Sequence, residues 1–200
     1  MAPLVASMAI LPRDTIKNFG LIAIHSASPI HLQSVNAAGN KFWIGKDTQT
    51  YCPAIEGLDC SHFQNITAFS QGSKSDTLGL DTEVPGGQAV YVSPKGALSF
   101  TIAHSGATPA GSTYESFKAT LNNSGNQLGD LSYNGTDSFV ACPTRGKKGH
   151  REGPYQVFVD VNNSLKNKDV PLGHVDECIG FLAATVKLDT AKSPAAWQYQ

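Results

Sequence analysis

Apolar and polar residues alternate over short stretches of this chain, and glycine- and proline-rich turns separate the stretches. Residues 98–102 alternate cleanly, as in a hairpin strand with one face in water. Residues 19–26 are apolar on both faces, as in a strand buried between layers. No segment combines a sustained 3.6-residue apolar period with a helix cap. The pattern therefore predicts an all-β protein.

The clearest group of strands lies in the second half of the chain. Asn134-Gly135 is a favoured two-residue hairpin turn, because both residues tolerate a positive φ. We therefore expect residues 131–133 and 139–141 to pair with each other. Alternation resumes from Tyr155 to Val161 as a third strand. Further strands are expected at 19–26, 30–35, 42–44, 66–69, 88–92, 98–102, 116–121 and 178–188.

About twelve short strands in 200 residues suit one antiparallel β-sandwich or β-barrel. The sequence Ile22-Ala-Ile-His-Ser-Ala-Ser-Pro29 has an echo in Ile102-Ala-His-Ser-Gly-Ala-Thr-Pro109, which keeps a β-trefoil-like barrel among the alternatives. We expect a single domain over residues 15–190. Residues 1–14 are interpreted as a signal remnant, pro-segment or flexible arm, and residues 191–200 as a polar tail.

Charge and cysteine content restrict the class of protein. The chain has 15 basic and 16 acidic residues, a balance that does not favour nucleic acid or a polybasic membrane anchor as partner. No stretch approaches 18 apolar residues, so no membrane span is expected. The four cysteines allow three pairings; we favour Cys52–Cys60 closing a short loop and Cys142–Cys178 joining two strands.

Four N-glycosylation sequons support a secretory route. They begin at Asn65, Asn122, Asn134 and Asn162. Together with an even number of cysteines, they favour an oxidising extracellular environment over the cytosol.

Three groups of polar residues could in principle form a chemical site. His25-Ser26 and His104-Ser105 resemble half of a hydrolase triad, but adjacent strand residues point to opposite faces. Residues Asp169, His174, Asp176 and Glu177 lie near turn residues and are interpreted as solvated. No catalytic residue, metal site or cofactor is therefore predicted.

Two sets of residues remain as candidates for binding a partner. The stretch 145–151 lies between two strands and offers cationic or titratable side chains to a polysaccharide or a host surface molecule. These side chains are Arg145, Lys147, Lys148, His150 and Arg151. Tyr133 and Trp197 are the candidates for stacking on sugar rings, because each neighbours an amide side chain.

Several blocks resemble the small secreted fungal cell-wall proteins of the phialide-development (PhiA) type, some of which are described as IgE-binding allergens. The blocks are Phe19-Gly20 with Ile22-Ala-Ile-His-Ser26, Phe42, Phe139-Val-Ala-Cys-Pro143, Gly153-Pro154 followed by an aromatic residue and Val157, and Asp176-Glu-Cys-Ile-Gly-Phe181. They cover most of residues 18–186. The chain departs from the pattern at Tyr155, where tryptophan is expected, and in a longer loop around Cys52 and Cys60. The resemblance brings no catalytic residues.

These observations predict a secreted, glycosylated, non-enzymatic protein of the fungal cell wall that contributes to the structure of the wall or spore surface. Two alternatives stay open. One is a secreted effector, elicitor or toxin that acts on a host, and the other is a lectin-like carbohydrate-binding module.

Overall fold

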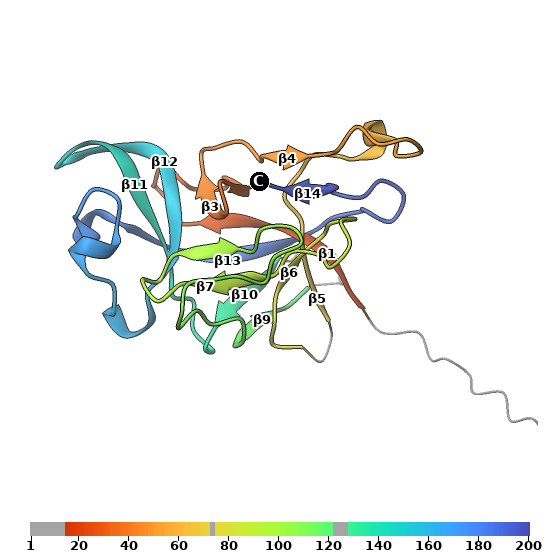
Figure 1. The fold of residues 1–200 in the computed structure, drawn as a ribbon. Coiled ribbons are helices and arrows are strands. Elements are labelled where there is room, and N and C mark those ends of the chain that lie inside the picture. The colour runs from red at the N-terminus through yellow and green to blue at the C-terminus, as the bar shows by residue number, and fades with distance from the viewer. Residues whose placement is uncertain (1–14, 73–74, 122–127) are drawn as a thin grey trace, which may run out of the picture.

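The computed structural model describes residues 15–72, 75–121 and 128–200, and it is all-β as predicted (Figure 1). Within these ranges a 12-stranded antiparallel sheet follows the order β6-β5-β1-β13-β11-β12-β3-β8-β7, with β2, β9 and β10 off this path. A small sheet pairs β4 with β14. The predicted N-terminal segment 1–14 and the sequon at Asn122 lie outside the described residues.

The strands are short, apart from four of nine or ten residues. Their bounds are β1 Thr15–Ile24, β2 Val35–Ala38, β3 Lys41–Ile44, β4 Thr50–Tyr51, β5 Phe69–Gly72, β6 Gly79–Leu80, β7 Val90–Val92, β8 Leu98–Phe100, β9 Phe117–Ala119, β10 Gly129–Tyr133, β11 Phe139–Lys147, β12 His150–Val159, β13 Ile179–Lys187 and β14 Gln198–Tyr199. Single turns of 3-10 helix form at η1 Cys60–His62, η2 Val161–Asn163, η3 Asn167–Asp169 and η4 Val175–Glu177.

Strand β13 connects the two halves of the large sheet. Its first residues, from Ile179 to Phe181, pair with β11, while Leu182–Lys187 pair with β1. The sheet does not close as a barrel and has a sandwich-like form, so of the predicted alternatives the sandwich is the one confirmed, and the barrel and trefoil forms are not found.

Phenylalanine rings link the two halves of the core. Phe42 lies 5.1 Å from Phe69 and 5.4 Å from Phe100, measured between ring centroids, and Phe69 also stacks on Phe19. All four side chains are at most 1% exposed. They come from β1, β3, β5 and β8, so burial of their apolar surface holds together strands that lie far apart in the sequence.

For the hairpin predicted at Asn134-Gly135, the turn is confirmed but the pairing of its two strands is wrong. Both residues have positive φ, and Tyr133 exchanges two backbone hydrogen bonds with Thr136. The strands then separate, because β10 pairs with β9 and β13, while β11 pairs with β12 and β13. The local turn forms as expected, but burial against other strands decides the pairing.

The last residues are part of the domain, which corrects the predicted polar tail. Tyr199 is 1% exposed, and its hydroxyl donates to the carbonyl of Ile66 at 2.8 Å. The amide of Gln88 clamps the Tyr199 backbone: Tyr199 N–H donates to its oxygen at 2.7 Å, and its nitrogen donates to the Tyr199 carbonyl at 3.0 Å. Figure 1 shows β14 beside β4.

Candidate functional site

Both predicted disulfides are confirmed. Cys52 is bonded to Cys60 across eight positions, and Cys142 to Cys178 across 36. The first closes a loop between β4 and η1. The second joins β11 to the residue that follows η4, next to the pairing of Ala141 with Ile179. The segment before β13 is thus fixed covalently to the longest hairpin of the protein.

That hairpin, formed by β11 and β12, carries the predicted cationic stretch at its end (Figure 1). Lys147 pairs with His150 across the turn, and Arg145 pairs with Glu152. Because partners across an antiparallel pair share a face, these four side chains extend from one side of the hairpin. Arg145, Lys147, Lys148 and His150 are exposed. They form the cationic tip and are available to a partner.

Arg151 was predicted to bind a partner together with the other side chains of 145–151, but in the structure its side chain is paired within the protein and holds the hairpin in place. Its guanidinium forms an ion pair and a hydrogen bond with the Glu177 carboxylate, and the two side chains are only 12% and 13% exposed. Gly149 N–H donates to the other oxygen of Glu177 at 2.8 Å. These hydrogen bonds, led by the one from Arg151, hold the pKa of Glu177 below its usual value.

The two aromatic residues predicted to stack on sugars are poorly placed for it. Tyr133 is 6% exposed and packs edge-on against Phe117, with ring centroids 5.0 Å apart, so it belongs to the core. Trp197 is half-buried and lies 6.3 Å from Phe63 in an edge-on arrangement.

Three of the four sequons begin at described residues outside the strands. Asn65, Asn134 and Asn162 are exposed and have φ between 51° and 56°, a left-handed conformation that asparagine tolerates. Thr67, the third residue of the first sequon, is 7% exposed, and its hydroxyl accepts a hydrogen bond from Ala37 N–H at 2.8 Å. A glycan at Asn65 would therefore have to be attached before this part of the chain folds.

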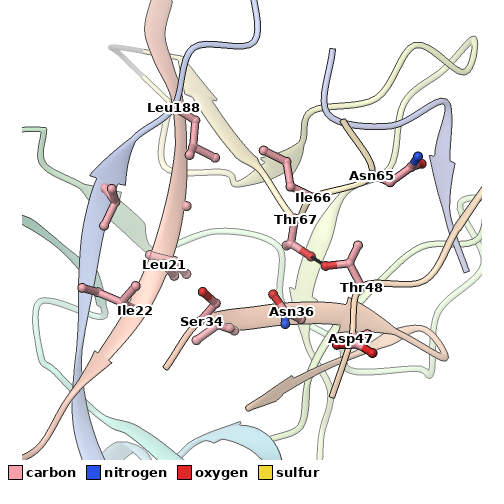
Figure 2. Close-up of a pocket in the computed structure, with 13 residues that line it drawn as sticks. Leu21, Ile22, Ser34, Asn36, Asp47, Thr48, Asn65, Ile66, Thr67 and Leu188 are labelled. Carbon is pink, nitrogen blue, oxygen red and sulfur yellow. Dashed lines mark hydrogen bonds between the residues drawn. The ribbon is translucent and has the colours of Figure 1, made fainter. Parts of the chain in front are cut away.

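A groove of about 510 Å³ lies where β1 and β2 diverge (Figure 2). The strands meet at a bridge between Ile22 and Ser34 and then separate. Leu21 and Ile22 line one side of the groove, with Leu188 beyond them, and Ser34 and Asn36 line another.

Several polar side chains that line this groove already have hydrogen-bond partners in the protein. The hydroxyls of Thr48 and Thr67 are 2.7 Å apart, and the Asn36 amide donates to the Lys46 carbonyl at 2.8 Å. Asp47 is the one ionisable side chain among the lining residues. This arrangement can accept a small ligand with apolar and hydroxyl groups. Sequence reasoning missed it, because its residues come from separate segments and carry no motif.

The two His-Ser pairs and the acidic cluster around His174 form no common site. The His25 ring bonds the Gly180 carbonyl, while His104 lines a separate cavity with Tyr114. His174 lies 3.9 Å from Asp176. Over the described ranges, no three His, Cys, Asp or Glu side chains are grouped so as to hold a metal ion. None of the helices in these ranges is long and apolar enough to cross a membrane.

The fold and its cystines define a disulfide-stapled β-sandwich of the kind that occurs in oxidising extracellular surroundings. Residues 19–200 match the PhiA-like secreted protein family, and the chain belongs to that family. A protein described as an uncharacterized secreted protein of Arthroderma benhamiae is 35% identical over 195 residues, which is 94% of this chain and 89% of the relative. No solved structure gives a significant match.

Proposed function

We propose that this protein is a non-enzymatic, N-glycosylated component of the fungal cell wall that binds wall polysaccharide and contributes to the wall or spore surface. The observation that carries the proposal is membership of a secreted family over nearly the whole described domain, with a relative in a fungus. The covalent framework supports it, since one disulfide closes the loop after β4 and the other ties the segment before β13 to β11. Cystines of this kind suit prolonged residence outside the cell.

Co-sedimentation with insoluble polysaccharides tests the proposal. The glycosylated protein is mixed with chitin, β-1,3-glucan, cellulose and intact fungal walls over a salt series, and reducing sugars are assayed in the supernatant. We expect retention that persists above ~0.2 M salt, because contacts with neutral sugars are not screened as exposed ionic contacts are. We expect no release of sugar. Absence of retention on all four solids, or release of sugar, would contradict the proposal.

A second candidate function is that of a secreted effector engaging an acidic host surface. The observation that favours it is the cationic tip, where Arg145, Lys147 and Lys148 are all exposed at the end of a pinned hairpin. This function predicts binding that is lost above ~0.2 M salt. The same salt series therefore separates the two candidates.

A further inference from the structure

A cavity of about 470 Å³ lies on the outer face of the sheet, away from the main core. Four adjacent strands, β12, β3, β8 and β7, form its base. Lys41 pairs with Ser99, and Ser99 pairs with Tyr91, so the three side chains form a row across the strands on one face. Trp43 is two residues after Lys41 and therefore lies on the same face of β3. Gln156 of β12 is directly opposite Trp43, so its side chain is on this face too.

Two loop segments enclose this outer face. On one side Asp169, Val170 and Pro171 line the cavity, and Val170 packs with Phe158 of β12 in a second, smaller apolar cluster. On the other side Pro109 lines it, and Tyr114 from the same loop lies 5.7 Å from the ring of Tyr91. Beneath these loops the outward-facing side chains of Tyr91, Ser99, Gln156 and Phe158 are buried, and a hollow is left between the two segments.

Two polar side chains at the base of the cavity face it without a partner in the protein. Gln156 is 5% exposed and Tyr91 is 9% exposed. Neither the amide of Gln156 nor the hydroxyl of Tyr91 makes a hydrogen bond with another side chain or backbone group in residues 15–72, 75–121 or 128–200. Neither group is among the fully buried side-chain atoms that lack a partner, so both polar groups are open to the cavity and available to hydrogen-bond a ligand.

The rim adds charged side chains to this base. Lys41 and Lys95 are exposed at the opening, and Asp169 also lines it, with one oxygen accepting from Lys166 N–H at 3.2 Å. Amide, hydroxyl and ammonium groups around an aromatic and aliphatic floor match a polyhydroxylated ring, whose hydroxyls need donors and acceptors while its C–H faces need apolar contact.

We propose that this cavity, over Lys41, Tyr91, Ser99 and Gln156, binds a sugar unit of a polysaccharide. The proposal rests on the proposed wall function and gives it a binding site. Gln156 and Tyr91 hydrogen-bond the ring hydroxyls from below, and the two lysines donate from the rim. The site is distinct from the groove of Figure 2, where the polar groups already bind each other.

Titration of the protein with soluble oligosaccharides, followed by NMR of the backbone amides, tests the site. The probes are chitohexaose and laminarihexaose, which represent fungal walls, and tetragalacturonate, which represents plant walls. We expect saturable shifts at residues 41, 91, 99 and 156 with at least one probe.

Gln156→Leu keeps the size of the side chain and Tyr91→Phe removes one hydroxyl, and each is expected to weaken binding about 3- to 10-fold. The melting temperature of each variant is measured first. Should Gln156→Leu fail to fold, Tyr91→Phe and the exposed pair Lys41→Gln/Lys95→Gln test the same site. The matched control is Lys118→Gln/Lys187→Gln, which makes the same charge change at exposed positions outside the cavity and the cationic tip and is expected to bind like the wild type.

Shifts centred elsewhere, or wild-type affinity in every site variant, would overturn the site and leave the proposed wall function standing. Retention on intact walls without any shift from the three probes and without any effect of the site variants would do the same. Loss of both retention and oligosaccharide binding in the wild type would overturn the proposed function together with the site.

Discussion

Removing the disulfide between Cys142 and Cys178 should destabilise the protein far more than removing the one between Cys52 and Cys60. The cross-links span 36 and eight positions. In the chain-entropy account, a loop of that longer span contributes about 4 kcal/mol at 25 °C and the shorter one about 2.5 kcal/mol. Cys142 is also 1% exposed and packs with Phe158 and Leu165. Cys142→Ala/Cys178→Ala therefore also loses buried contacts, which cost about 1 kcal/mol more.

The assay is urea unfolding followed by tryptophan fluorescence, with Cys52→Ala/Cys60→Ala as the control. The free energies of unfolding are compared, and not only the urea midpoints. Without the cross-link the unfolded chain exposes more surface, which steepens the dependence of the unfolding free energy on urea concentration. A cost of about 5 kcal/mol corresponds to a lowering of the melting temperature by about 10 to 20 °C for a domain of this size. If the short-loop variant loses as much stability as the long-loop variant, the entropic argument is refuted.

Three further predictions concern the hairpin and the C-terminal strand. The pKa of Glu177 lies below its ordinary value near 4.5, so the carboxylate stabilises the hairpin fully at neutral pH, and this stabilisation is lost as pH falls through the lowered pKa. The NMR shift of the Gly149 amide, which donates to Glu177, should therefore titrate below pH 4.5. Glu177→Gln should abolish this titration. Tyr199→Phe should cost about 1 to 3 kcal/mol in urea unfolding, because it leaves Ala68 N–H and the Ile66 carbonyl unpaired, whereas Tyr51→Phe, at a side chain 47% exposed, should cost close to nothing. Arg145→Gln/Lys147→Gln/Lys148→Gln should elute from heparin at lower salt than Lys118→Gln/Lys168→Gln/Lys187→Gln, which removes the same charge from scattered exposed sites; equal elution would show that the cationic tip adds nothing beyond net charge.

Alternation predicted most strands, but the strand expected at 30–35 is wrong, because the chain turns over residues 26–32 and β2 begins only at Val35. Residues 41–44 read exposed, buried, half-buried, buried, and Leu98 and Phe100 are buried as their phase requires. The disulfides were also within reach, because short local loops and cross-strand neighbours restrict the pairings. These successes depend on side-chain period and chain proximity, which are local properties of the sequence.

Strand partners and the fate of the C-terminus depend on contacts that no local pattern contains. Leu131 and Tyr133 are at the buried positions of their strand, as alternation predicts. The Asn134-Gly135 turn led to the prediction that this strand pairs with the next one, whereas in the structure it pairs with β9 and β13. The last residues look polar by composition, but contacts with distant residues hold them in the domain, among them the hydrogen bonds of the Tyr199 hydroxyl and those of the Gln88 amide, 111 positions away from Tyr199.

The proposed sugar site was hidden for a related reason. Ser99, Gln156 and Tyr91 occupy the positions of the alternating pattern that normally face water, and sequence reasoning assigned that face of the 98–102 strand to solvent. In the structure they are 5% to 9% exposed, because loops from residues 104–114 and 161–177 cover this face and build a second apolar cluster around Phe158. A polar side chain at such a position can hydrogen-bond a partner in the protein or face the hollow. Ser99 uses the Ala97 carbonyl, at 3.4 Å, while Gln156 has none in the described chain. The polar positions of these alternating strands thus form the base of a pocket covered by loops. They supply the hydrogen-bonding groups with which the proposed site would recognise a hydroxylated ligand.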